Sequence, residues 1–482
     1  MRSQDEYLAG LQDGRTVYYQ GEPVIDLTAH PVLSTCAGHA AKAFGPAPTG
    51  VADTDWTAVG AHGAHSAYYR VPRSPEELLA RARLIEGETA SHLGQFNIVK
   101  AVGSDAMCAL SALRHELEGQ DGFDARANIE AFINRVQSED LATVMAQTDA
   151  RGDRSKRPGQ QQNPNAYLRV VEERAEGVVV RGAKLHTTST PYADEVIVFP
   201  TRAMRDGEEP FAIAFSIPAA TKGIIMICRP VRESLDVFDN PISSRAFEIE
   251  TTTIFDDVLV PWDRIFLHRQ PSKAGLMART FATYHRFTGL SYKPPLADLL
   301  IGVASVLARD NGVRGKAVVD TKLAEIINYV SVIRGCRTAS AVDCVYWPDG
   351  EAMPAPVMTN AGKYFFAANF HNIAQLAQDI AGGLTVTAPA RADFANPALR
   401  PHLDNVLRGE TLDAAMRVVV FNILRDLTAS ELGGYNYVAS LHGEGSMSAQ
   451  LLAALGDYDV GVCEEMVLGI AQSAINEANW SQ

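Results

Sequence analysis

The chain has 482 residues, of which 46% are hydrophobic, which is enough to build two or three packed subdomains. Its formal net charge of -14 and its pI near 5.4, together with the lack of a basic run, argue against a nucleic-acid partner. The N-terminal stretch has no apolar signal-peptide core, and no uninterrupted apolar stretch is long enough for a membrane span, so we expect a cytoplasmic protein.

The six cysteines are scattered along the chain and form no CxxC pair. This spacing predicts neither a disulfide framework nor a bound metal.

Residues 1–145 read as a helical region. Ser74 and Glu77 have the spacing of a capping box, with Pro75 at the first helical position, and apolar residues then recur at helical spacing. We therefore predict that a helix begins at Pro75.

Residues 146–268 read as a β region. Short apolar and β-branched runs alternate with turns, beginning with YLRVV near residue 167. The last run, FEIETTTIFDDVLVP, ends at Pro261, a residue that tolerates strand ends but not strand centres.

Residues 269–482 return to helical periodicity, separated by joints with Pro and Gly. Gly382 and Gly383 follow the third segment and are typical of a helix C-terminus. The helical segments are expected at 296–308, 314–345, 360–381, 410–432 and 459–478.

Several longer stretches carry a family pattern: TDARGDRSKRP (148–158), YLRVVEERAEGVVVRGAKLHTTST (167–190), EVIVFPTRAM (195–204) and IFDDVLVPWDRIFL (254–267). Together they resemble the 4-hydroxyphenylacetate 3-hydroxylase superfamily, and the likeness extends over nearly the whole chain. The resemblance implies an α+β, acyl-CoA dehydrogenase-like fold. It also implies an N-terminal helical domain, a central β-barrel domain and a C-terminal four-helix bundle that assembles homotetramers.

Two branches of this superfamily have to be distinguished. One contains phenol hydroxylases that receive reduced FAD from a separate flavin reductase, and the other contains 4-hydroxybutyryl-CoA dehydratase, which adds an iron–sulfur cluster. The dehydratase pattern needs three Cys and one His as ligands, because thiolates hold such clusters. Here the stretch 92–103 contains no Cys, Tyr292 stands in place of the third, and only His285 remains.

The phenol-hydroxylase pattern is also incomplete. That branch places an Arg and a Tyr around residues 103–105, and a His where this chain has Met145. The clamp that binds and deprotonates a phenol is therefore missing.

The resemblance implies a flavin site whose residues come from three segments. The DRSKRPGQQQ loop would lie against the flavin ring, although by composition alone it is a solvated surface loop. In the family, the segment that ends with the Gly pair approaches FAD across a subunit interface. The implied cofactor-binding residues are Arg154, Gln160, Gln161, His186, Thr188, Gly382 and Gly383.

Two residues are candidates for acid–base catalysis. His285 lies on a predicted helix, and the family places it facing the flavin, although a lone His there is more often a satisfied core residue. Glu250 is retained from the dehydratase pattern, although an outward-facing strand residue is an equal alternative.

The leading hypothesis is a two-component monooxygenase that uses reduced FAD and O2 to hydroxylate an aromatic or other electron-rich small molecule. The first alternative is a cluster-free lyase or isomerase, similar to 4-hydroxybutyryl-CoA dehydratase, acting on a carrier-bound acid. The second alternative is a flavin-binding or structural subunit that has lost activity.

Overall fold

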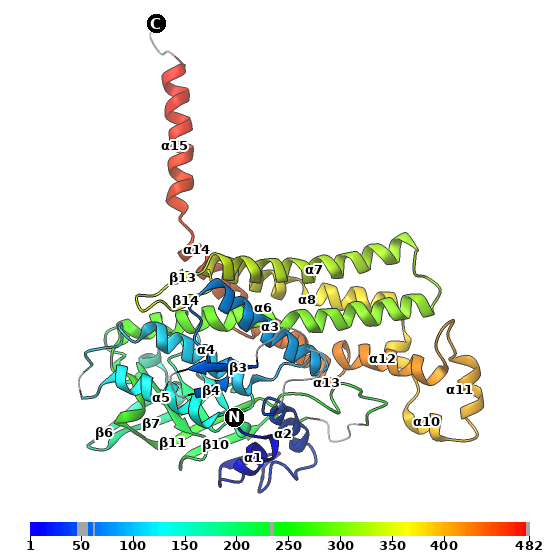
Figure 1. Cartoon of the computed structure of the whole chain (residues 1–482), viewed down its shortest axis with the longest axis horizontal. Helices are drawn as coiled ribbons and strands as arrows, with labels where there is room; N and C mark the ends of the chain where they lie inside the picture. The colour runs from blue at the N-terminus through cyan, green and yellow to red at the C-terminus, as the bar shows by residue number, and fades with distance from the viewer. Residues whose placement is uncertain (46–55, 61–62, 121, 232–235, 479–482) are drawn as a thin grey trace.

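The structure is a computed structural model that describes residues 1–45, 56–60, 63–120, 122–231 and 236–478. Helices come first along the chain, two sheets follow, and a group of long helices completes the molecule (Figure 1). A large cluster of buried apolar residues runs through the sheets and the helices that pack on them.

In its described residues the N-terminal part contains five α-helices, the β3–β4 pair, and the strands β1 and β2, which join a sheet of the central part. Ser74 caps α3 by accepting a hydrogen bond from the Glu77 N–H, so the helix begins at Pro75 as predicted. The Glu77 carboxylate accepts from the Arg73 N–H rather than from that of Ser74, so only half of the expected capping box forms. The elements are α1 (Gln4–Gly10), β1 (Thr16–Tyr19), β2 (Glu22–Pro23), α2 (Leu33–Ala41), β3 (Thr57–Gly60), β4 (Gly63–Ser66), α3 (Pro75–Ser91), α4 (Ile98–Leu113) and α5 (Ala125–Glu139).

Helix α4 is buried at every residue. It packs against both α6 and β5, so it lies between the helical bundle and the sheets. A side chain on α4 can therefore contact groups from either neighbour.

The central part forms two open sheets. The larger has the order β2-β1-β10-β11-β7-β6, and the smaller has the order β12-β9-β8-β5. In the larger sheet β1 pairs in parallel with β10, which lies far along the chain. The strands are β5 (Thr143–Ala146), β6 (Arg169–Arg174), β7 (Gly177–Lys184), β8 (Glu195–Val198), β9 (Ile213–Pro218), β10 (Ile224–Cys228), β11 (Thr251–Pro261) and β12 (Ile265–His268).

The expectation of a β-barrel is wrong for the described residues. A closed barrel has no edges, whereas each of these sheets has two edge strands, β2 and β6 in one and β12 and β5 in the other. The predicted mixture of helix and sheet is confirmed, and the division into three domains stays a prediction.

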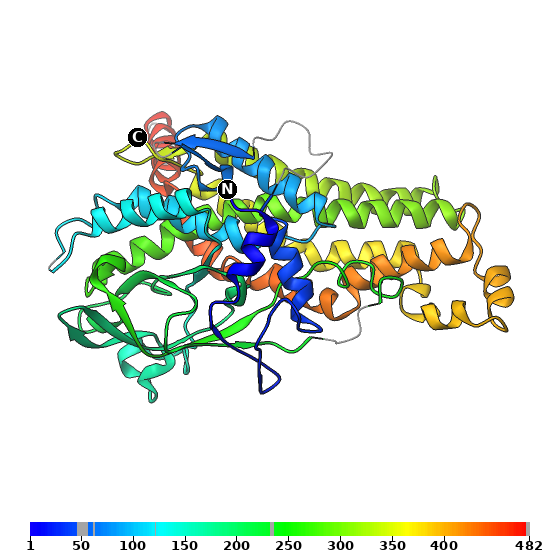
Figure 2. The same ribbon diagram turned by 60° about the horizontal axis from the view of Figure 1, so that its bottom comes forward.

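Three long helices dominate the C-terminal part and lie side by side in both views (Figures 1 and 2). They are α6 (Pro271–Asp310), α7 (Ala317–Val342) and α8 (Pro356–Ala381). By length and composition α6 could cross a membrane, but 61% of its most apolar window is buried inside the protein. That burial is typical of a core helix.

Helix α8 ends as the sequence indicates. Gly382 has φ of 89°, a conformation that favours glycine, and its N–H donates to the Gln378 carbonyl at 2.8 Å. Between α7 and α8 lie β13 (Val345–Tyr346) and β14 (Ala352–Met353); after α8 come α9 (Leu384–Thr387), α10 (Arg391–Ala395), α11 (Arg400–Val406), α12 (Ala414–Thr428), α13 (Glu431–His442), α14 (Met447–Asp457) and α15 (Val460–Glu477).

Candidate functional site

The contact between α4 and α6 places a histidine against a buried carboxylate. His285 on α6 lies with Nδ1 at 3.1 Å from Oδ2 of Asp105 on α4, and the Asp105 side chain is fully buried. Phe281, one turn earlier on α6, stacks on the His285 ring with an interplanar angle of 17°. The orientation of the imidazole is therefore set by both an ion-pairing partner and an aromatic face.

The second carboxylate oxygen of Asp105 is also engaged. Arg81 on α3 donates to Oδ1 at 2.7 Å, and the Thr288 hydroxyl donates to the same atom at 2.7 Å. The Arg81 guanidinium is itself buried, so the ion pair lies in a medium of low dielectric, where it is stronger than in water.

About two helical turns beyond His285 on α6, a second charged cluster surrounds Glu444. This residue lies between α13 and α14, and its carboxylate is 3.2 Å from the Lys363 ammonium. Tyr292 donates a hydrogen bond to the same carboxylate. Burial raises the pKa of Glu444, but the charges of Lys363 and Lys293 outweigh it and bring this pKa down to about 2.

Lys293 follows Tyr292 on α6, and its positive charge is only partly offset by the nearby Glu444 carboxylate. Its side chain is buried, and its ammonium lies over the rings of Tyr292 and Phe366 at 4.6 and 4.9 Å. Burial lowers the pKa of Lys293 to about 8 despite the attraction of Glu444. A buried lysine whose pKa is lowered in this way is a candidate for a functional role.

Replacing Lys293 by Met is expected to raise the free energy of unfolding by about 1–3 kcal/mol near pH 7, because the buried cation is removed without loss of side-chain volume. In the wild type, the unfolded chain holds this proton up to the ordinary lysine pKa, whereas the folded chain loses it above about 8. Wild-type stability therefore rises with pH across that interval. Urea unfolding should show the difference between the two proteins shrinking at about pH 10. A variant that is less stable than the wild type at both pH values contradicts this account.

A third group of polar side chains surrounds Glu250, the residue immediately before β11. Thr188 and Tyr435 both donate to its Oε1 at 2.8 Å, and within the described part of the chain its buried Oε2 has no hydrogen-bond partner. Glu248, two residues earlier, accepts from the Ile98 N–H at the start of α4. Burial and the charge of Glu250 raise the pKa of Glu248 well above its usual range.

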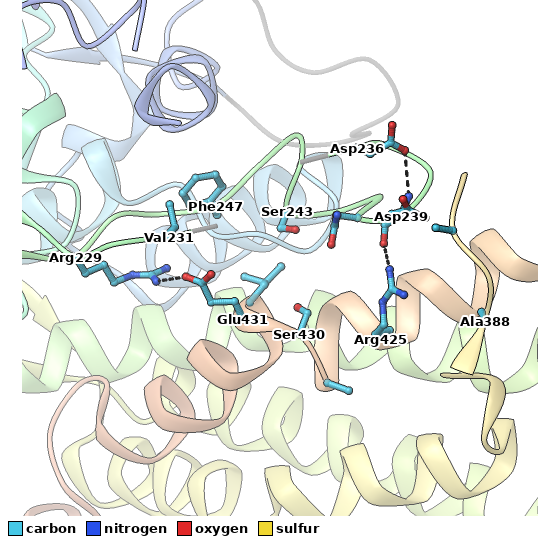
Figure 3. Close-up of a pocket in the computed structure, with 14 residues that line it drawn as sticks. Arg229, Val231, Asp236, Asp239, Ser243, Phe247, Ala388, Arg425, Ser430 and Glu431 are labelled. Carbon is cyan, nitrogen blue, oxygen red and sulfur yellow. Dashed lines mark hydrogen bonds and ion pairs between the residues drawn. The ribbon is translucent and has the colours of Figure 1, made fainter. Parts of the chain in front are cut away.

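A pocket of about 340 Å³ opens between α12, α13 and the segment after β10 (Figure 3). Arg229 lies 5.1 Å from the centre of the Tyr435 ring and pairs with Glu431 at 3.0 Å. Arg425 reaches the pocket from α12, where it donates to the Asp239 carbonyl. The N-terminus of α13, capped by Ser430, lies at the same wall.

The structure brings some of the predicted site residues together and leaves others apart. Thr188 contacts Glu250 directly, whereas His285 belongs to the separate contact with Asp105. The remaining predicted cofactor residues lie on surface loops: Arg154, Gln160, His186, Gly382 and Gly383 are exposed, and Gln161 is partly buried where it ties the loop to Asp153. Their roles toward FAD stay predictions.

Sequence reasoning missed several groups that the fold gathers here. Asp105 is a carboxylate within an otherwise largely apolar helix, IVKAVGSDAMCALSAL, and that contrast was the available signal. Glu444, Lys293 and Tyr435 had no local signature. Their proximity follows from helix packing and could not be read from spacing.

Comparison with known proteins shows the family. The 4-hydroxyphenylacetate 3-hydroxylase N-terminal family matches residues 3–267, and its C-terminal family matches residues 274–472. The chain belongs to the 4-hydroxyphenylacetate 3-hydroxylase family. The resemblance that was drawn from the sequence is thereby confirmed.

Both branches of the family are among the relatives. The chain is 29% identical to a 4-hydroxybutyryl-CoA dehydratase/vinylacetyl-CoA-Δ-isomerase of Clostridium aminobutyricum, over 97% of this chain and 98% of that protein. It is also 29% identical to the oxygenase component of 4-hydroxyphenylacetate 3-monooxygenase of Thermus thermophilus, over 90% and 89% of the two chains.

Solved structures agree with the family assignment. An oxygenase component of 4-hydroxyphenylacetate 3-monooxygenase complexed with FAD superimposes with a TM-score of 0.90 at 26% identity, covering 99% of both chains. A glutaryl-coenzyme A dehydrogenase is similar in fold alone, with a TM-score of 0.50 and 14% identity over 81% of both chains. The expected acyl-CoA dehydrogenase-like architecture is confirmed at this coarse level.

Proposed function

We propose that this chain is the oxygenase component of a two-component flavin monooxygenase. It takes reduced FAD from a separate flavin reductase and uses O2 to hydroxylate an aromatic or other electron-rich small molecule. The proposal is supported by the family match over both parts of the chain and by relatives that are oxygenase components.

The observation that carries the choice between the two branches is the environment of Tyr292. An iron–sulfur cluster would need a thiolate there, but Tyr292 stacks on Phe96 at 4.0 Å between ring centres and donates to Glu444. No Cys lies within residues 92–103 either. The residues present therefore do not fit a cluster, and we derive no step through one.

The residues present do fit FAD. The pocket beside Tyr435 has two guanidinium groups and a helix N-terminus on its walls, and these are the groups that bind a diphosphate. Tyr435 links the pocket residue Arg229 to Glu250, whose unpartnered oxygen, like the Thr188 hydroxyl, can accept a hydrogen bond from a polar ring edge. We assign Arg229 and Arg425 to the cofactor site alongside Arg154, Gln160, Gln161, His186, Thr188, Gly382 and Gly383.

Reduced FAD, when bound, would supply the two electrons with which O2 is activated; one oxygen atom of O2 passes to the substrate and the other leaves as water. The protein then has to exclude water and to handle protons at the substrate. His285 is the proton acceptor or donor on α6, and Glu250, held by Thr188 and Tyr435, is a second acid–base group.

Replacing Arg425 or Arg154 by Ala is expected to weaken the binding of reduced FAD by about tenfold or more, because each change removes a charged hydrogen-bond donor. Anaerobic equilibrium titration with FAD reduced by dithionite measures the dissociation constant. Arg174→Ala is the matched control, since the exposed Arg174 pairs with Glu172 on the edge strand β6 and does not line this pocket. Unchanged affinity in both test variants contradicts the assignment of these residues.

The competing function is a cluster-free lyase or isomerase acting on a carrier-bound acid. It is favoured by the Clostridium relative and by the buried cluster of Lys293, Lys363 and Glu444, which offers charges to an acyl group. The two functions differ in their need for oxygen: the lyase turns over anaerobically and the monooxygenase does not.

We also propose that the protein works as a homotetramer in the cytoplasm. Helix α15 extends away from the rest of the chain (Figure 1) and has no buried residue, although it carries many large apolar side chains. Such a surface is typical of a subunit interface. The exposed apolar residues of α15 are Val460, Val462, Met466, Val467, Leu468, Ile470 and Ile475.

Light scattering of the intact protein is expected to give four times 52.1 kDa. Changing Met466 and Ile470, which are four residues apart on α15, to Lys should lower this mass, because charges are then placed in an apolar contact. The same mass in both proteins would show that α15 is not the interface.

A further inference from the structure

The hydrogen bonds around Asp105 leave little freedom to the His285 imidazole. A carboxylate only accepts hydrogen bonds, so its contact at 3.1 Å places the proton of a neutral imidazole on Nδ1. The other ring nitrogen, Nε2, then presents a lone pair, and no hydrogen bond from the described residues engages it. The His285 side chain is 18% exposed, so this nitrogen can be reached.

We propose that Asp105 is a positioning residue that makes His285 the proton acceptor for an ionisable O–H group of the substrate, such as a phenol. The inference rests on the proposed function and names the residues that replace the missing phenol clamp. In the step, the substrate O–H bond breaks and an N–H bond forms at Nε2. The electron pair stays on the oxygen, which becomes the anion that a monooxygenation of an aromatic ring requires.

Charged side chains lie around the pair of His285 and Asp105. The imidazole contacts the Asp105 carboxylate, and the Glu444 carboxylate is close enough to interact electrostatically with His285. Lys363 pairs with Glu444, while Arg81 pairs with Asp105 and holds it in place. Asp105 therefore acts on His285 through the hydrogen bond that fixes its tautomer.

Asp105→Asn tests the tautomer because of the way Oδ1 is held. Arg81 and Thr288 both donate to Oδ1, so the amide oxygen of Asn must occupy that position. The amide N–H2 then faces Nδ1 of His285 and donates to it. Nδ1 becomes the acceptor, the ring proton moves to Nε2, and the lone pair that takes the substrate proton is lost.

The probe is 4-nitrophenol, because its anion absorbs visible light and its neutral form does not. It is titrated into the protein anaerobically in the presence of reduced FAD, at a pH where the free phenol is mostly neutral. The wild type is expected to bind it as the anion, and Asp105→Asn and His285→Gln should reduce the bound anion by about tenfold or more. Binding of reduced FAD and the thermal midpoint show that each variant is folded.

Ser104→Ala is the matched control. Ser104 accepts a hydrogen bond from the same Arg81 nitrogen but does not contact His285, so its loss should leave the spectrum of bound nitrophenol unchanged. A neutral bound phenol in the wild type, no binding at all, or an equal anion signal in Asp105→Asn would each overturn the proposal. None of these results affects the reaction of bound reduced FAD with O2, which tests the proposed function separately.

Discussion

His285→Ala is expected to lower product formation by about 10²–10⁴, the usual contribution of a positioned acid–base group. Reduced FAD should still bind and be reoxidised by O2, because the proposed cofactor groups lie on other elements, around Thr188 and Arg425. Oxygen consumed without hydroxylation appears as H2O2. The measurement is the ratio of H2O2 released to reduced FAD oxidised, in single turnovers with and without substrate.

A second variant, Phe281→Leu, distinguishes the loss of the acid–base group from the loss of the contact that orients its ring. Phe281 stacks on His285 but has no group that can take a proton. We expect an intermediate loss of product in this variant, because the ring is less firmly held. Full coupling between flavin oxidation and product formation in His285→Ala would remove His285 from the mechanism.

Gly103→Ala is expected to destabilise the fold by about 3 kcal/mol or more, the upper range for overpacking. A Cβ at this position would lie 1.9 Å from Oγ1 of Thr143 and 2.5 Å from its backbone oxygen. The backbone of β5 cannot move aside as a flexible side chain can, so α4 and β5 must separate. Because Asp105 is on the same helix, the contact with His285 should loosen as well.

Chemical denaturation followed by circular dichroism measures this effect, with Gly302→Ala as the control. Gly302 is an exposed residue of α6 with no atom within 4 Å of the added carbon. There the substitution should stabilise the protein by about 0.5–1 kcal/mol, because alanine loses less backbone entropy in a helix. Equal stability in the two variants would contradict the close approach of α4 and β5.

Local signals predicted the helix starting at Pro75 and the helix end at Gly382, because a cap depends on residues that are neighbours in sequence. The prediction of a β-barrel was wrong, because closure of a sheet depends on which strands pair. Alternating apolar residues do not specify that β1 pairs with β10. The edge strands of the two sheets therefore could not be predicted from the sequence.

The same distinction applies to the site. Thr188 and Glu250 were found from the resemblance, and the fold places them in contact. Helix packing brings Asp105 on α4 to His285 on α6, and it brings Glu444 of the α13–α14 connection near Lys293 on α6. The sequence pattern within one helix does not show which helix will pack against it in the folded protein.

The most direct test of the central claim is the reaction of protein-bound reduced FAD with oxygen. FAD is reduced anaerobically in the presence of the purified protein, mixed with oxygenated buffer and followed by stopped-flow absorbance. We predict that the flavin reoxidises in resolved phases that differ from the course of free reduced FAD. A time course identical to that of free flavin, together with substrate turnover in the absence of O2, would contradict the monooxygenase and establish the lyase.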